Sequence, residues 1–123
     1  MKHRQEGRSI TAEFDVFTLV VAYVPNSKDG LARLDYRVDE WDADFHEYLR
    51  DLERTKGKPV ILCGDLNVAR DPIDIYSTVG KEKTAGYSPQ ERRSIKAFLD
   101  SGFTDTYRHL YPNRVQYSFW SQR

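Results

Sequence analysis

Apolar residues in the first half of the chain follow the patterns of β-strands. Residues 9–24 first alternate between polar and apolar side chains and then become continuously apolar, which predicts a strand, a bend near Glu13–Asp15 and a second, buried strand. A later apolar run, Val60-Ile-Leu-Cys63, is typical of a strand covered on both faces, and the glycine after it allows a sharp exit. We therefore expect Cys63 to be a small residue of the core.

Between these strands, the spacing of apolar residues predicts one long amphipathic helix. Apolar side chains recur every three or four positions from Leu31 to Leu52, and the pattern ends at Gly57. The charged residues between them, including Arg37 and Asp42, are expected on the solvated face of this helix. A strand–helix–strand order predicts a right-handed crossover that joins two strands of one sheet, so the predicted fold class is α/β.

The second half of the chain combines an irregular stretch with a well-marked helix. Residues 70–87 are too long and too polar for a simple connection, and loops of this kind are often functional or mobile. The sequence Ser88-Pro-Gln-Glu91 has the spacing of a helix start with a capping box, and Gly102 marks the end of that helix. Alternation over Gln116–Trp120 predicts a further strand.

Composition narrows the setting without identifying a partner. The chain has 123 residues, enough for one domain with a modest core. Lys plus Arg number 19 and Asp plus Glu number 19, so no overall positive charge indicates nucleic acid. The single cysteine argues against a disulfide framework. No apolar run approaches the roughly 20 residues that span a bilayer, and no signal-peptide pattern is present. We expect no membrane partner and a location in the cytoplasm or nucleoid, or in the nucleus of a eukaryote.

Polar side chains follow the ends of both apolar strands. Asp65 and Asn67 come directly after Gly64, while Tyr23 and Asn26 end the earlier strand. If the two strands are neighbours, these side chains share the sheet edge at which ligands of α/β proteins gather. A carboxylate beside an amide that orients water suits a hydrolytic centre. An Asp-Leu-Asn turn that only caps the strand explains the same residues, and the sequence pattern leaves both interpretations open.

Several stretches together resemble one family of enzymes. The stretches occur in order over nearly the whole chain: Ala22-Tyr-Val-Pro-Asn26, Gly64-Asp-Leu-Asn-Val-Ala69, Thr84-Ala-Gly-Tyr-Ser-Pro-Gln-Glu-Arg92, Tyr107-Arg-His-Leu-Tyr-Pro112 and Tyr117-Ser-Phe-Trp120. Gly-Asp-Leu-Asn is shared across the endonuclease/exonuclease/phosphatase superfamily, whereas the longer stretches resemble its exonuclease III-type abasic-site (AP) endonucleases. The resemblance implies that residues 1–123 are one partial domain, a portion of a four-layer α/β sandwich.

The resemblance also implies a reaction on DNA. It is hydrolysis of a phosphodiester 5′ to an abasic site in double-stranded DNA, with Mg²⁺ or Mn²⁺ as metal and with 3′–5′ exonuclease activity as a second possibility. In this family Asp65 would orient or deprotonate the attacking water, or protonate the leaving oxygen, and would be a possible metal ligand. Asn67 would position Asp65 and the phosphate, and Tyr23 and Asn26 would hold the scissile phosphate. Such chemistry needs in-line water, neutralised charge and oriented donors.

Four further residues take DNA-side roles by the same resemblance. Lys28 lies in the loop after the first motif, where the family contacts DNA. Thr84 and Arg92 lie in or near the DNA-facing loop, and several relatives have an amide where this chain has Thr84. Phe119 would line the pocket that receives the flipped-out sugar.

Departures from the family pattern bear on activity. The strand with the principal metal-ligand Glu would precede Ser9, and the active-site His–Asp pair would follow Arg123, so the chain matches the middle of the family domain. We expect trace activity at most from the isolated chain, because one carboxylate is a poor Mg²⁺ site. One alternative is a non-catalytic fragment that binds DNA weakly, or that pairs with a complementary half or with itself through uncovered sheet edges. A less favoured alternative is a phosphatase or lipid phosphodiesterase of the same superfamily.

Overall fold

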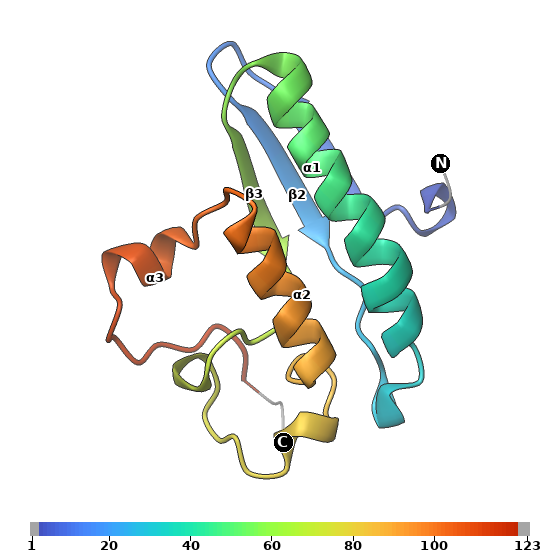
Figure 1. Ribbon diagram of the computed structural model, residues 1–123, viewed down its shortest axis with the longest axis vertical. Helices are drawn as coiled ribbons and strands as arrows, with labels where there is room; N and C mark the ends of the chain where they lie inside the picture. Colours follow the sequence, from blue (N-terminus) through green and yellow to red (C-terminus); the bar gives the residue numbers. More distant parts are fainter. Residues whose placement is uncertain (1–2, 121–123) are drawn as a thin grey trace.

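A computed structural model describes residues 3–120 as one three-stranded sheet with helices packed against it (Figure 1). Its strands and longer helical segments are β1 (Ser9–Glu13), β2 (Thr18–Tyr23), the π-helical segment η3 (Tyr36–Asp42), α1 (Ala43–Lys56), β3 (Val60–Asp65), α2 (Pro89–Asp100) and α3 (Thr106–Leu110). Short 3₁₀ turns are η1 (Arg4–Glu6), η2 (Asp29–Leu31), η4 (Pro72–Asp74) and η5 (Lys81–Lys83). No helix in this range is long and apolar enough to cross a bilayer. The mixed α/β class is confirmed.

The sheet has the order β1-β2-β3, with β1 antiparallel to β2 and β2 parallel to β3. A tight connection joins the first two strands, in which the Phe14 N–H donates to the Phe17 carbonyl over 2.9 Å. In Figure 1 the arrows of β2 and β3 point the same way, because α1 carries the chain back to the start of the sheet. The predicted strand–helix–strand unit is therefore present.

One core lies between the sheet and the helices. Val20 and Leu49 are fully buried and join β2 to α1, while Phe98 adds a ring from α2. The core cluster comprises Val20, Ala22, Val24, Trp41, Phe45, Leu49 and Phe98. Burying an aliphatic side chain of this size contributes about 1.5–3 kcal/mol, so these contacts are the main force that holds α1 on the sheet.

The opposite face of the sheet is open over the described residues. Val60 and Leu62 pack against the core, but Ile61 between them is 46% exposed, and Cys63 is exposed as well. The expectation of a strand covered on both faces, with Cys63 in the core, is therefore wrong for residues 3–120. Successive strand residues point to opposite faces, and helices cover only one face here.

The predicted helix from residue 31 to 57 is interrupted by a wider turn. The segment η3 is π-helical, and α1 continues from it as regular α-helix from Ala43. Arg37 and Asp42, expected on the solvated face, are each 3% exposed, and Arg37 Nε donates to Asp42 Oδ1 over 2.9 Å. The widened turn places residues five apart on one side, which a pattern of 3.6 residues per turn does not predict.

In the second half, the helix start is confirmed and the last strand is not. Ser88 and Glu91 form the predicted capping box at the start of α2. A short helix, α3, follows where no element was predicted, capped by the Asp105 side chain. Gln116–Trp120 is not a strand, because no other strand lies beside it in the described chain to complete its backbone hydrogen bonds.

Replacing Gly64 by alanine should strongly destabilise the protein. Gly64 has φ +120°, and a Cβ there would lie 2.1 Å from the Ala22 carbonyl oxygen. Gly102 is a matched control, since its φ is +121° and a Cβ there meets no atom within 4 Å. We expect Gly64→Ala to lower the free energy of unfolding by about 3 kcal/mol or more, and by much more than Gly102→Ala, in urea titrations followed by fluorescence. Equal losses in the two variants would show that the close approach of β2 is not the cause.

Acid should destabilise the fold through His46. Burial lowers the pKa of His46 from 6.5 to about 4, and its ring stacks on Phe98 with centroids 4.3 Å apart. Because the unfolded chain binds this proton more tightly, the stabilising contribution is complete above about pH 6.5 and is lost as the pH falls toward 4. We expect the wild type to lose about 2 kcal/mol more than His46→Gln between about pH 7 and pH 5, by urea unfolding. Parallel pH profiles of the two proteins would contradict this assignment.

Candidate active site

Two exposed polar side chains end the neighbouring parallel strands. Tyr23 and Asp65 are register partners of β2 and β3, and the Val24 N–H donates to the Asp65 carbonyl over 2.9 Å. Tyr23 is 56% exposed, and Asp65 is exposed as well. The carboxyl ends of both strands therefore present a phenol and a carboxylate at one edge of the sheet.

An amide pair lies directly beside this carboxylate. Asn26 Nδ2 donates to Asn67 Oδ1 over 3.1 Å, and Asn67 Nδ2 donates to the Val24 carbonyl over 2.7 Å. One oxygen of Asp65, Oδ1, accepts the Asn67 backbone N–H at 2.9 Å. The structure thus brings Tyr23, Asn26, Asp65 and Asn67 together.

Local backbone geometry reconciles the two interpretations of the Asp-Leu-Asn segment. The bond from the Asn67 N–H to the Asp65 carboxylate is that of an Asx turn, so the turn is real. Asn67 has φ +48°, a left-handed conformation that asparagine tolerates better than most residues. The turn itself aims the Asn67 amide at Asn26, and one oxygen of Asp65 has no partner among residues 3–120. Turn and candidate site are therefore the same structure.

A cation lies next to the phenol and was not predicted. The Arg8 guanidinium is 5.2 Å from the Tyr23 ring centroid, and Nη1 donates to the Tyr23 carbonyl over 3.1 Å. Glu6 bonds to Arg8 at 2.5 Å, and hydrogen bonds from Arg8 and Arg33 lower the pKa of Glu6 to about 2. No motif in the sequence marked Arg8, because its position depends on the pairing of β1 with β2.

Beneath the amide pair lies a buried guanidinium. Arg37 Nη1 donates to the carbonyls of Pro25 and Asn67 over 3.1 and 3.2 Å, and Nη2 donates to the Leu66 carbonyl over 3.0 Å. It therefore bonds to the backbones of both strand-end loops. Periodicity assigned Arg37 to the surface, and only the π-helical turn reveals its true position.

The residues expected on the DNA side differ in their surroundings. Lys28 and Thr84 are exposed loop residues. Arg92 has protein partners, since its Nε donates to the Arg70 carbonyl over 2.9 Å and its guanidinium lies 4.5 Å from the Tyr87 ring centroid. Phe119 is 82% exposed. Of these four residues, Lys28 is joined directly to the amide pair, because its backbone N–H donates to Asn26 Oδ1 over 2.7 Å.

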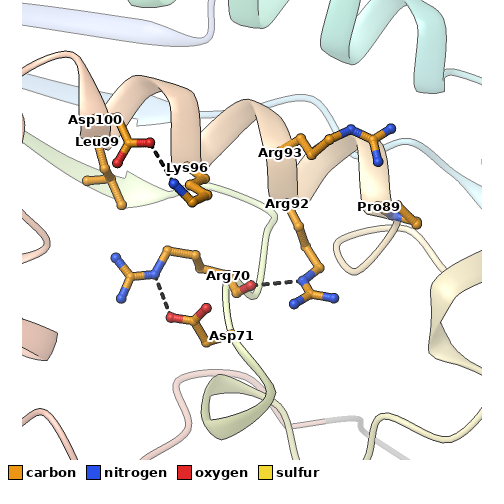
Figure 2. A pocket seen from close by; sticks show the side chains of 8 residues that line it. All are labelled: Arg70, Asp71, Pro89, Arg92, Arg93, Lys96, Leu99 and Asp100. Carbon is orange, nitrogen blue, oxygen red and sulfur yellow. Dashed lines mark hydrogen bonds and ion pairs between the residues drawn. The ribbon is translucent and has the colours of Figure 1, made fainter.

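A separate open cleft lies between α2 and the loop after β3 (Figure 2). In the figure, Arg70 bonds to Asp71 and Lys96 to Asp100, at 2.8 and 2.6 Å. The lining residues are Arg70, Asp71, Pro89, Arg92, Arg93, Lys96, Leu99 and Asp100. None of the four candidate active-site residues lines this cleft, and its cations are largely paired with protein groups.

The described residues do not form a metal site by themselves. No group of three or more His, Cys, Asp or Glu side chains within residues 3–120 is arranged to hold a metal ion. Asp65 is one carboxylate at the candidate site, whereas Mg²⁺ is usually held by one or two carboxylates together with waters and substrate phosphates. The expected Mg²⁺ therefore does not fit the residues present here without further ligands.

Comparison with known proteins assigns the family. The profile of the Endonuclease/Exonuclease/phosphatase family matches residues 2–122. The chain is 51% identical to the DNA repair nuclease APEX1 of Danio rerio over 121 residues, 98% of this chain and 38% of that protein. It is 46% identical to an exodeoxyribonuclease of Bacillus subtilis over 123 residues, 99% of this chain and 48% of that protein.

A solved structure agrees with these sequence relatives. The AP endonuclease of Leishmania major superposes with a TM-score of 0.84 at 34% identity, over 96% of this chain and 41% of that one. The chain thus spans less than half the length of each of these three relatives. It belongs to the endonuclease/exonuclease/phosphatase family and resembles that family's DNA-repair nucleases.

Proposed function

We propose that this chain supplies the phosphate-holding part of a DNA-repair nuclease that hydrolyses the phosphodiester 5′ to an abasic site in duplex DNA. The observation that carries this proposal is the Asn26–Asn67 amide pair next to Asp65, at the shared carboxyl edge of two parallel strands. Similarity to a DNA repair nuclease and to an AP endonuclease supports the choice of DNA as substrate.

Each polar group has a specific task in this proposal. Asn26 and Asn67 each donate one amide N–H within the protein, which leaves a second N–H for a phosphate oxygen. Tyr23 adds a phenol O–H, with the Arg8 cation near its ring. Donors held in place before reaction stabilise charge as it develops on the phosphate, without the cost of reorganising water.

Asp65 is the proton-transfer group of the proposed site. Its Oδ1 is held by the Asn67 N–H, so the carboxylate cannot rotate freely, and its other oxygen is directed away from this bond. A carboxyl in this position either takes a proton from the attacking water or returns one to the leaving oxygen. Lys28 and Thr84, from two different loops, are proposed to contact the DNA backbone. Arg92 is proposed to support the loop after β3 through the Arg70 carbonyl, and Phe119 to form part of the sugar pocket.

The isolated chain is proposed to be weak or inactive as a nuclease. Asp65 alone does not make up a metal site, so the complete reaction needs ligands beyond those described. The alternative of a non-catalytic DNA-binding fragment therefore predicts the same result for the chain alone. Only a test in the context of a complete relative separates the two.

The purified chain by itself provides one test of this proposal. We expect at most trace nicking of an abasic duplex by the purified chain with Mg²⁺, and none with EDTA, measured on end-labelled DNA. The same protein should be folded by circular dichroism. Robust metal-dependent nicking would show that the chain, alone or self-associated, completes the site, and would contradict the proposal that ligands are missing.

A chimera tests the candidate site within a complete relative. The chain should replace the aligned segment of the Bacillus subtilis exodeoxyribonuclease, to which it is 46% identical. We expect the chimera to nick an abasic duplex, and Asp65→Asn to lower its rate by about 100-fold or more, because a positioned proton-transfer group contributes about 10²–10⁴-fold. Asp15→Asn serves as the matched control, because Asp15 is exposed and lies in the connection between β1 and β2.

The chimera also discriminates between functions. Equal rates for Asp65→Asn and Asp15→Asn in a folded chimera would overturn the role of Asp65. A folded chimera without nicking would favour the non-catalytic alternative. Cleavage of phosphoinositides in place of abasic DNA would favour the lipid phosphodiesterase alternative. Degradation of 3′-recessed duplexes by the same chimera would measure its exonuclease activity.

A further inference from the structure

Two buried charged side chains lie where the loops around the candidate site meet. Arg37, from η3, is 3% exposed, and Glu91, from α2, is 0% exposed. Arg37 Nη1 lies 4.0 Å from Glu91 Oε1. Charged side chains are rarely buried unless they are paired and hydrogen-bonded. The hydrogen-bond partners of Arg37 and Glu91 therefore show which segments these side chains hold in place.

All nitrogen atoms of the Arg37 guanidinium donate hydrogen bonds. Nε donates to Asp42, and the two Nη atoms donate to the carbonyls of Pro25, Leu66 and Asn67. Pro25 directly precedes Asn26, and Leu66 directly precedes Asn67. The planar fork of one arginine thus joins the residues next to both amides, and a lysine ammonium cannot reproduce this geometry.

Glu91 bonds to more groups than a capping box requires. Its Oε2 accepts the Ser88 N–H at 3.1 Å, as expected for a capping box, and also accepts the Ser88 hydroxyl at 2.7 Å. The same oxygen accepts the Gly86 N–H at 2.9 Å, and Oε1 accepts the Ser27 hydroxyl at 2.5 Å. Glu91 therefore joins the residue after Asn26 to the loop around Gly86.

The hydrogen-bond partners of Arg37 and Glu91 come from three separate segments of the chain. Arg37 holds both strand-end loops, Glu91 holds one of them together with residues 84–88, and the two side chains lie side by side. The Ala69 N–H donates to the Gly86 carbonyl over 2.8 Å and closes the ring between residues 84–88 and the loop after β3. Three segments far apart in the sequence therefore share one buried charged pair.

We propose that Arg37 and Glu91 are positioning residues that hold the Asn26–Asn67 amide pair in its hydrogen-bonded arrangement and link it to the loop at residues 84–88. What the amides bind rests on the proposed function, but how they are held does not. The competing interpretation is that the pair contributes only to overall stability. The two interpretations differ in whether loss of the pair affects the amides more than the core.

NMR of the full chain tests this without any assay of activity. The signals under test are the side-chain amides of Asn26 and Asn67. The backbone amides of Val20 and Leu49 serve as the core reference. In Arg37→Lys and in Glu91→Gln, we expect hydrogen exchange of the Asn67 Nδ2 protons to speed up by about tenfold more than exchange of the core amides. Arg50→Lys and Glu47→Gln, both exposed on α1, are matched controls that should change neither.

Several outcomes would overturn the proposal. Uniform acceleration of exchange at core and amide signals alike would assign the pair to overall stability alone. A second measurement uses the wild type and therefore does not depend on whether the variants fold. In the wild type, the Nε and Nη protons of Arg37 should exchange far more slowly than those of exposed Arg50. Equal rates would show that the buried hydrogen bonds do not exist.

A titration separates this proposal from the proposed function. Adding an abasic duplex to the wild type should shift the Asn26 and Asn67 side-chain signals if the amides hold DNA phosphate. Amides that depend on Arg37 and Glu91 but do not respond to DNA would leave the positioning role intact and would count against the proposed function.

Discussion

The Val24 N–H donates to the Asp65 carbonyl over 2.9 Å, directly beyond the Tyr23–Asp65 register pair of β2 and β3. Because these strands are parallel, both chains leave the sheet at the same edge and in the same direction. The close approach of Gly64 to Ala22 permits this pairing, since a Cβ at Gly64 would collide with the Ala22 carbonyl. The placement of the phenol, the carboxylate and both amides depends on this pairing.

Polar groups buried behind that edge hold the two loops together, whereas apolar contacts hold the helices. The core from Val20 to Phe98 attaches α1 and α2 to the sheet and reaches the loops at Val24 and Leu66, the first residue after each strand. Around the loops, Arg37 and Glu91 form hydrogen bonds with backbone groups, including the Pro25 carbonyl and the Gly86 N–H. A hydrophobic contact is not directional, while a guanidinium fork holds its acceptors at fixed angles. A site that must present oriented amides is better supported by the second kind of contact.

One face of the sheet is left uncovered by the helices among the described residues. Ile61 and Cys63 are exposed on this face, in a strand that reads as apolar throughout. The apolar run alone predicts two covered faces, whereas the helices among the described residues pack on only one face of the sheet. The relatives are more than twice as long as the segment that this chain matches.

The sequence by itself determined the features that depend on neighbours a few residues away. The amino-acid pattern predicts the two apolar strands, the turn after Gly64, the capping box at Ser88 and the polar residues at both strand ends. Tertiary structure alone decided the burial of Arg37 and Asp42, the exposure of Cys63, the irregular conformation of Gln116–Trp120 and the nearness of Arg8 to Tyr23. The reason is that these properties depend on which distant segments lie alongside. A π-helical turn can reverse the face on which a charge lies, and a strand can form only where another strand is there to pair with it.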